Sequence, residues 1–266
     1  MRRHTDQFEL RTPEGRVSIP FSDIGRPGGV AAISVHGWGC SKEDFDPIAE
    51  RLADEHRIIT LTLPHEVSGN MERRLHVIDA LAARHGLGQY ALIGHSRGGD
   101  DATEQGFRRP DAVVGIAGVA ASFEMSDRYL TGLVADMPKD EFVYGNGYDV
   151  HVARLVGSQN AGLRKYGHHV AAFTESERLA YHTSAVESVA RARAGGSLHQ
   201  FLGFQGVKWY VHGEFERAAY LPTLQAHPEV TVAEIPGADH FPDIDNPEGY
   251  ASATRGFMRA VNLAAK

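Results

Sequence analysis

Cysteine is almost absent from this sequence of 266 residues, where Cys40 is the only one. A single cysteine cannot form an internal disulfide, and it excludes the zinc sites that are built from several thiolates. No basic partner that would lower the pKa of its thiol is evident. We therefore interpret Cys40 as a small buried side chain and not as a nucleophile.

Long apolar runs and an excess of basic residues are also missing. The formal net charge is −7, with 27 Lys and Arg against 34 Asp and Glu, which argues against a nucleic-acid partner. No apolar run approaches the length of a membrane span, and the N-terminal MRRHTDQFEL lacks the apolar core of a signal peptide. We therefore expect a cytoplasmic protein without a membrane partner.

Motifs for a metal or a nucleotide cofactor are missing as well. The 15 histidines are scattered and form no H-E-x-x-H pattern. The GNG at 145–147 has no third glycine at the required place, and no predicted strand ends just before it. The sequence therefore predicts neither a metal site nor a cofactor.

What the sequence does contain is an alternation of apolar strands and amphipathic helices. Two short alternating runs on either side of Pro13-Glu14-Gly15 predict an antiparallel hairpin. Strands are predicted at 29–37, 57–63, 89–94, 111–121, 207–213 and 230–235, and helices at 41–56, 70–85, about 97–109 and from about 247 onward. This order predicts an α/β fold with a mostly parallel central sheet, helices on both faces and a mixed edge.

A long segment without strand character separates the strand that ends near residue 121 from the one that begins near residue 207. Leu179, Val186 and Val189 predict a helix within it. We interpret residues 123–203 as a mainly helical lid over the site. The lid would be inserted into a core formed by residues 1–122 and 204–266.

The stretch GHSRGG (94–99) lies where a predicted strand turns directly into a predicted helix. Such a bend leaves its apex residue strained and exposed, and it needs small neighbours because other backbone passes close by. Ser96 occupies the apex, just before a helix N-terminus that favours developing negative charge. We therefore predict that Ser96 is a nucleophile. A serine hydroxyl needs a base, and His240, in the loop after the last predicted strand, is the candidate.

Three motifs in the expected order resemble the α/β-hydrolase superfamily over nearly the whole chain: VHGWG (35–39), GHSRGG (94–99) and ADHFPDIDNPE (238–248). The resemblance implies an oxyanion hole formed by the backbone N–H groups of Trp38 and Arg97, with His36 as a structural companion. It also implies a carboxylate that orients the histidine, in the chain order Ser, acid, His.

The identity of that carboxylate stays open in the sequence. The position that the superfamily most often uses holds Glu216, in VHGEFERAAY, with Glu214 two residues earlier. Some members take the acid from the end of the preceding strand, where Glu124 and Asp127 lie in AASFEMSD. We predict Glu216, with Glu214 and Glu124 as alternatives.

Two features depart from the superfamily's usual pattern. Asp100 and Asp101 stand where small apolar residues are usual, and we expect them to turn away from the nucleophile or to pair with a base such as Arg97. The run LTLPHEVSG (61–69) replaces the frequent D-x-P/R-G-x-G-x-S motif, so the loop at 64–70 is expected to differ in shape.

The resemblance implies a serine hydrolase that cleaves a carboxylic ester, a thioester or a lactone through an acyl-enzyme on Ser96. The alternatives are a cofactor-free dioxygenase of a heteroaromatic ring, a hydroxynitrile lyase, and a ligand-binding receptor-like member. A haloalkane dehalogenase is excluded because it needs a carboxylate at the elbow. We expect a small-molecule ester, lactone or aromatic substrate, and the sequence leaves a homodimer open. Polar and aromatic lid residues favour a moderately polar substrate: Tyr144, Tyr148, Tyr166, His168, His169, Tyr181 and His182.

Overall fold

One mixed sheet organises the chain. The computed structural model describes residues 3–13, 15–216 and 218–265, and within them the strand order is β1-β2-β4-β3-β5-β6-β7-β8. β1 and β2 form the predicted hairpin, and β2 also pairs antiparallel with β4. The remaining pairs are parallel. Of the residues predicted to join the two hairpin strands, Glu14 lies outside the described residues. The strands are β1 (Arg3–Thr12), β2 (Gly15–Gly25), β3 (Ala31–Val35), β4 (Arg57–Leu61), β5 (Tyr90–His95), β6 (Val113–Val119), β7 (Val207–Gly213) and β8 (Val230–Ile235). The predicted mostly parallel α/β fold is confirmed.

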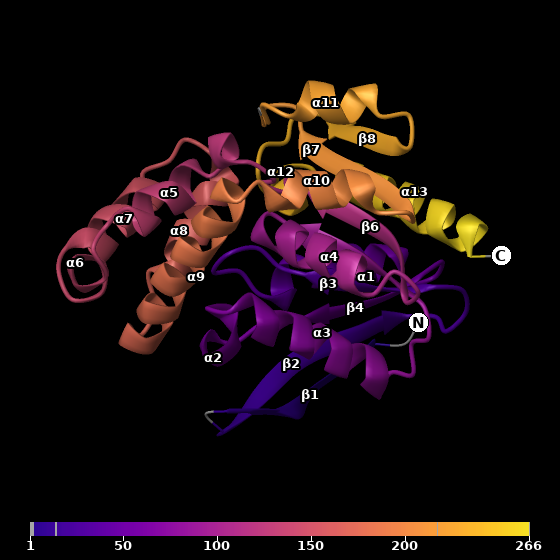
Figure 1. Cartoon of the computed structure of the whole chain (residues 1–266), viewed down its shortest axis with the longest axis horizontal. Helices are drawn as coiled ribbons and strands as arrows, with labels where there is room; N and C mark the ends of the chain where they lie inside the picture. The colour runs from indigo at the N-terminus through magenta and orange to yellow at the C-terminus, as the bar shows by residue number, and fades with distance from the viewer. Residues whose placement is uncertain (1–2, 14, 217, 266) are drawn as a thin grey trace.

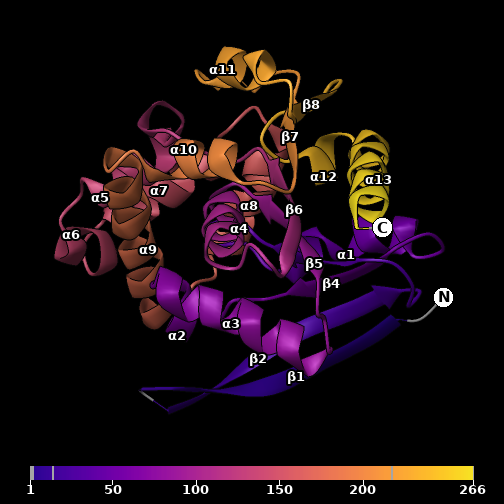
Figure 2. The same ribbon diagram turned by 45° about the vertical axis from the view of Figure 1, so that its right-hand side comes forward.

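Helices cover both faces of the sheet because successive strand residues point to opposite sides. In β5, Leu92 belongs to one apolar cluster, together with residues of α3, α4, α10 and α11, whereas Ala91 and Ile93 belong to a second cluster with α1 and α13. Figure 2 shows α4 and α13 on opposite sides of β6. The helices of the core are α1 (Asp46–Leu52), α2 (His65–Ser68), α3 (Met71–Arg84), α4 (Arg97–Arg108), α10 (Gly196–Gly203), α11 (Leu221–Ala226), α12 (Pro242–Asp245) and α13 (Pro247–Ala264).

Local sequence accounts for where these helices begin. The side chains of Asn70 and Asn246 accept hydrogen bonds from the third residue of α3 and of α13, as N-caps do. The helix predicted from residue 41 is shorter than expected. A 3-10 turn spans Lys42–Asp44, and α1 begins only at Asp46, because Pro47 fits the first turn of a helix but not its interior.

A helical insertion follows β6 and gathers at one end of the molecule (Figure 1). It has an apolar cluster of its own, in which Trp38 of the core packs with Phe142, Tyr148 and Tyr181. α10, by contrast, contributes Phe201 to the core of the sheet. The insertion comprises the 3-10 turn Met125–Asp127 and α5 (Tyr129–Ala135), α6 (Lys139–Val143), α7 (Gly147–Val156), α8 (Ala161–Val170) and α9 (Glu175–Arg193). The boundary drawn at residues 123–203 stays a prediction.

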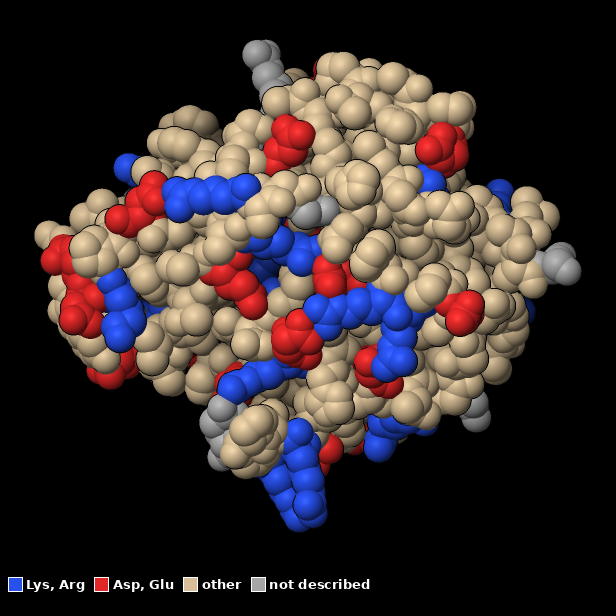
Figure 3. Space-filling view, viewed as in Figure 1, with Lys and Arg blue, Asp and Glu red and all other residues tan. Residues whose placement is uncertain are grey.

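The surface carries charges of both signs. On the face shown in Figure 3, acidic and basic side chains are interspersed and often adjacent. Ion pairs between surface residues include Arg108 with Glu72 and Arg109 with Asp79. Within the described part of the chain, no helix combines the length and apolar character that crossing a membrane requires.

Candidate active site

Ser96 lies at a strained turn between β5 and α4. Its φ of 51° and ψ of −120° place a residue with a side chain in a region that such residues rarely occupy. The flanking glycines make the turn possible. A Cβ at Gly94 would lie 2.2 Å from the carbonyl oxygen of Gly98, and one at Gly98 would lie 2.1 Å from that of Val35. Both positions therefore need glycine because of close backbone contacts.

Three polar side chains from separate loops form a continuous chain of hydrogen bonds. His240 follows β8, and its Nε2 lies 3.1 Å from Ser96 Oγ. Glu216 follows β7, and its Oε1 lies 2.9 Å from His240 Nδ1. The carboxylate can only accept, so Nδ1 carries a proton and Nε2 of the neutral ring is free to accept the serine proton. The arrangement is that of a nucleophile, a base and a group that orients the base.

The charge of Glu216 also sets the basicity of His240. Burial lowers the pKa of His240, but the hydrogen bond with Glu216 and the negative charges of Glu216, Asp239 and Asp243 outweigh burial. The pKa is therefore raised above its ordinary value, with Glu216 as the largest of the raising causes. The carboxylate therefore favours the imidazolium that would form when Ser96 gives up its proton.

The other predicted acids lie elsewhere. Glu214 Oε2 accepts a hydrogen bond of 2.8 Å from the Gly237 N–H, which ties two loops together. Glu124 precedes the 3-10 turn Met125–Asp127, and no hydrogen bond joins it to His240 within the described chain. The side chain of Asp127 is outside the described part. Of the described candidates, Glu216 is the one that reaches the histidine.

The turn at residues 37–40 lies against Ser96. A Cβ at Gly37 would be 3.3 Å from Ser96 Cβ, so this backbone passes directly beside the serine. Contacts from the insertion hold the turn: the Trp38 indole N–H donates to the Tyr181 carbonyl oxygen at 2.9 Å, and the Tyr166 hydroxyl donates to that of Trp38 at 2.7 Å. The Trp38 and Tyr181 rings stack with centroids 3.7 Å apart.

Two donors for a negatively charged oxygen are available near Ser96. Neither the Trp38 N–H nor the Arg97 N–H has a backbone acceptor among the described residues. For Arg97 the reason is general, because the first N–H groups of a helix have no partner within it. Both belong to segments adjacent to Ser96, as the sequence led us to expect, and their role as an oxyanion hole stays a prediction.

Two further histidines hold backbone in place. The Leu63 N–H donates to His36 Nε2 at 2.8 Å, so His36 holds the backbone after β4, in agreement with the structural role expected for it. His95, whose role the sequence did not suggest, donates from Nε2 to the His240 carbonyl oxygen at 2.8 Å. Burial, the largest cause, lowers the pKa of each ring to about 4. Both are therefore neutral near pH 7, and His95 positions the loop that carries His240.

Comparisons with known proteins rest on structure alone. No protein-family model matches the sequence, and no curated protein matches it. A thermophilic esterase from Thermogutta terrifontis matches with a TM-score of 0.74 at 21% identity, over 98% of this chain and 100% of that chain. A carboxylesterase structure from Nitrososphaera gargenis matches with a TM-score of 0.76 at 18% identity, over 96% and 99%. Haloalkane dehalogenase DbeA from Bradyrhizobium elkani gives 0.72 at 14% identity, over 98% and 100%.

The chain has the α/β-hydrolase fold. The matched proteins include esterases and a haloalkane dehalogenase, which carry out different reactions. The fold alone therefore does not identify the chemistry of this chain. The chemistry has to be argued from its site.

The two carboxylates that depart from the usual α/β-hydrolase pattern are both paired, although not with Arg97. Asp101 is bound by the Arg74 guanidinium through Nε and Nη2, and Asp100 by Arg128 Nη2, with distances of 2.7–3.1 Å. The expected pairing with a base is therefore found, but with Arg74 and Arg128 in place of the example Arg97. Arg97 donates from Nη1 to neutral oxygens instead, because Arg74 and Arg128 already occupy the carboxylates.

A cavity of about 150 Å³ opens beside the serine. Ser96 and His240 line it, and so do apolar side chains of the insertion and of the α12 loop, among them Leu130, Leu163 and Phe241. Of the lid residues singled out in the sequence, Tyr166 reaches this cavity, whereas Tyr144 is 62% exposed on the surface. Cys40 also lines this cavity, and its side chain is partly buried. Burial raises the pKa of the Cys40 thiol, which fits a non-nucleophilic role.

Proposed function

We propose that the protein is a serine hydrolase that cleaves a carboxylic ester, a thioester or a lactone. The observation that carries the proposal is the hydrogen-bonded chain Ser96–His240–Glu216, whose serine sits at a strained elbow and faces a cavity. The similarity to an esterase and a carboxylesterase agrees with it.

The first half of the proposed reaction acylates the serine. Ser96 Oγ attacks the substrate carbonyl carbon while its proton passes to His240 Nε2, and the carbonyl oxygen becomes an oxyanion. The backbone N–H groups of Trp38 and Arg97 stabilise that oxyanion, at about 3–4 kcal/mol for each donor. The bond to the leaving oxygen or sulfur then breaks, and the leaving group takes the proton from His240.

The second half releases the acid. A water molecule gives a proton to His240 Nε2 and attacks the acyl carbon, the Ser96 Oγ–carbon bond breaks, and the serine regains its proton. Throughout, Glu216 keeps the imidazole in the tautomer with Nδ1 protonated. In the ring dioxygenases that the resemblance offers as an alternative, the acid comes from the end of the strand before the insertion, which is β6 here. The acid that contacts His240 follows β7 instead, which favours hydrolysis.

The decisive test is covalent labelling with a fluorophosphonate. Attack of Ser96 Oγ on phosphorus with loss of fluoride should label the wild type at Ser96, and Ser96→Ala should remain unlabelled. Ser122→Ala is the matched control, since Ser122 lines the same cavity, and it should label normally. Turnover of p-nitrophenyl acetate and butyrate should follow the labelling. Unlabelled, folded wild type without turnover would refute the proposal.

The pH dependence provides a second prediction. Only neutral His240 can take the serine proton, so activity is present above its pKa and is lost as the pH falls through it. Because this pKa is raised, kcat/KM for p-nitrophenyl butyrate should fall to half at a pH above the ordinary histidine value of 6.5. Glu214→Gln should leave that midpoint in place. A wild-type midpoint below 6.5 would contradict the role given to Glu216.

A further inference from the structure

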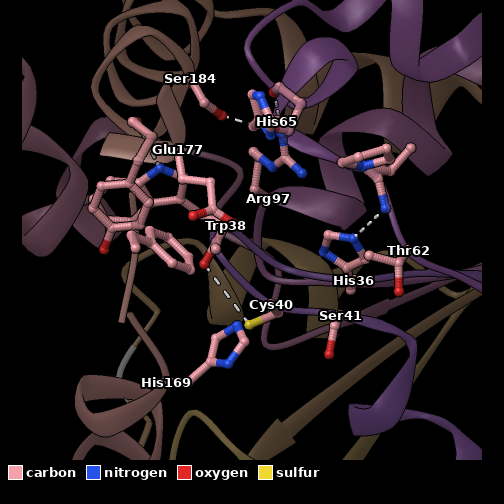
Figure 4. A pocket seen from close by; sticks show the side chains of 16 residues that line it. His36, Trp38, Cys40, Ser41, Thr62, His65, Arg97, His169, Glu177 and Ser184 are labelled. Atoms are coloured by element: carbon pink, nitrogen blue, oxygen red, sulfur yellow. Dashed lines mark hydrogen bonds between the residues drawn. The ribbon is translucent and has the colours of Figure 1, made fainter. Parts of the chain in front are cut away.

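A second cavity lies beside the 37–40 turn, and Ser96 is not among its lining residues. Its volume is about 160 Å³, and Trp38 and Cys40 line both cavities. Figure 4 shows the second cavity, with the Arg97 side chain among the labelled lining residues. Donor groups gather there: besides Arg97, the lining includes His65, His169, Thr62 and Ser184.

Arg97 is the unusual residue of this lining. It is only 4% exposed, and Nη1 donates to the Ser68 carbonyl oxygen at 2.8 Å and to Ser184 Oγ at 3.1 Å. Its Nε and Nη2 are buried without an acceptor among the described residues. These two nitrogens form one side of the guanidinium, where their N–H bonds run parallel as a fork.

Among the described residues no carboxylate hydrogen-bonds to Arg97, although the charges of Asp101 and Glu187 act on it from a distance. Its neighbour Arg74 has two carboxylates, Asp101 at 2.9 Å and Glu187 at 2.8 Å, whereas both acceptors of Arg97 are neutral. Burial and the charge of Arg74 lower the pKa of Arg97 to about 10, so it remains a cation near pH 7. Buried donors without an acceptor are costly to keep, and a carboxylate would satisfy both nitrogens of the fork.

We propose that this cavity binds a carboxylate group, held bidentately by Nε and Nη2 of Arg97. A monoanion with two parallel acceptor oxygens matches one cation with two parallel donors. Both nitrogens are buried, so binding requires that lining side chains move aside. Among the lining residues, His65 is partly exposed and His169 is exposed. The carboxylate belongs either to one end of the ester substrate or to a separate small organic acid.

Two variants with opposite expected effects make the proposal testable. Arg97→Met removes the fork. Glu177→Gln removes the negative charge of a carboxylate that lines the same cavity, and glutamine can still accept the hydrogen bond that Glu177 receives from the Thr174 N–H at 2.7 Å. Misfolding cannot explain one variant that binds an anion more weakly together with another that binds it more tightly.

The measurement is calorimetric titration of the full chain with acetate and, separately, with inorganic phosphate. Acetate should bind to the wild type, at least about tenfold more weakly to Arg97→Met and about two- to fivefold more tightly to Glu177→Gln. Equal acetate binding by all three proteins, or none, would overturn the proposal. Tighter binding of phosphate than of acetate would overturn the choice of a carboxylate. Neither result depends on Ser96 reacting, so the outcome is separate from that of the proposed hydrolysis.

Kinetics then distinguish the two sources of the carboxylate, and this arm rests on the proposed function. If the carboxylate is a charged end of the substrate, acetate competes with p-nitrophenyl butyrate, and mono-p-nitrophenyl glutarate is cleaved faster than the butyrate. Acetate that binds without raising the KM of the neutral ester assigns the carboxylate to a separate small organic acid.

Discussion

Replacing Glu216 by Gln is expected to lower kcat for p-nitrophenyl butyrate by about 10³- to 10⁴-fold, with little change in KM. The carboxylate oxygen lies 2.9 Å from His240 Nδ1, where it fixes the tautomer and favours the imidazolium. An amide lacks the charge, and its NH₂ group can donate to Nδ1, which places the ring proton on the wrong nitrogen. The loss would appear in the chemical step because Glu216 does not line the cavity beside Ser96.

The two rejected acids are the controls for this experiment. Glu214→Gln removes a charge only two residues away, from a side chain that binds the Gly237 N–H and not the histidine. Glu124→Gln removes the candidate that follows β6. Each should retain activity within about threefold of the wild type, because neither contacts His240. A larger loss in Glu124→Gln than in Glu216→Gln would show that the acid assignment is wrong.

Replacing Arg128 by Met is expected to lower the free energy of unfolding by about 3–5 kcal/mol. Arg128 and Asp100 are 3% and 1% exposed, and their closest contact is 2.7 Å. The variant would leave the Asp100 carboxylate buried in α4 without its cation, with Ser197 Oγ as the remaining donor that contacts it. Urea unfolding followed by tryptophan fluorescence gives the measurement.

Two comparisons separate the ion pair from other effects of Arg128→Met. The double variant Arg128→Met with Asp100→Asn should be more stable than the sum of the two single effects predicts, because no buried charge is left over. Arg193→Met breaks a surface pair with Asp136, whose side chains are 62% and 70% exposed, and should cost about 1 kcal/mol or less. A loss of similar size in Arg193→Met would contradict the role assigned to burial.

The sequence predicted the parts of the molecule that are determined locally. The elbow at Ser96 follows from glycines within a few residues of it, and the strands follow from continuous apolar runs. The choice between Glu214 and Glu216 could not be made in the same way, because both lie in one loop and only the turn of that loop decides which side chain reaches His240. The lid boundary has the same difficulty, since α10 lies next to the insertion in the chain yet packs on the sheet.

The partners of the two aspartates in α4 were beyond sequence reasoning for a different reason. Arg74 comes from α3 and Arg128 from the segment before α5, and no local pattern marks either residue as buried. Arginine is usually exposed, so sequence reasoning could offer only the adjacent Arg97 as an example of a partner. The unused donors of Arg97 become visible only when all three arginines and their acceptors are placed together.

The stacking of Trp38 on Tyr181 means that the insertion is not an exchangeable module. Tyr181 belongs to α9, yet its carbonyl oxygen and ring support the backbone turn beside Ser96. Replacing the insertion by that of another protein with this fold would remove that support. On the proposed function, substrate range should therefore be altered by point changes within the insertion, with Trp38 and Tyr181 kept as a pair, because core and insertion line one cavity.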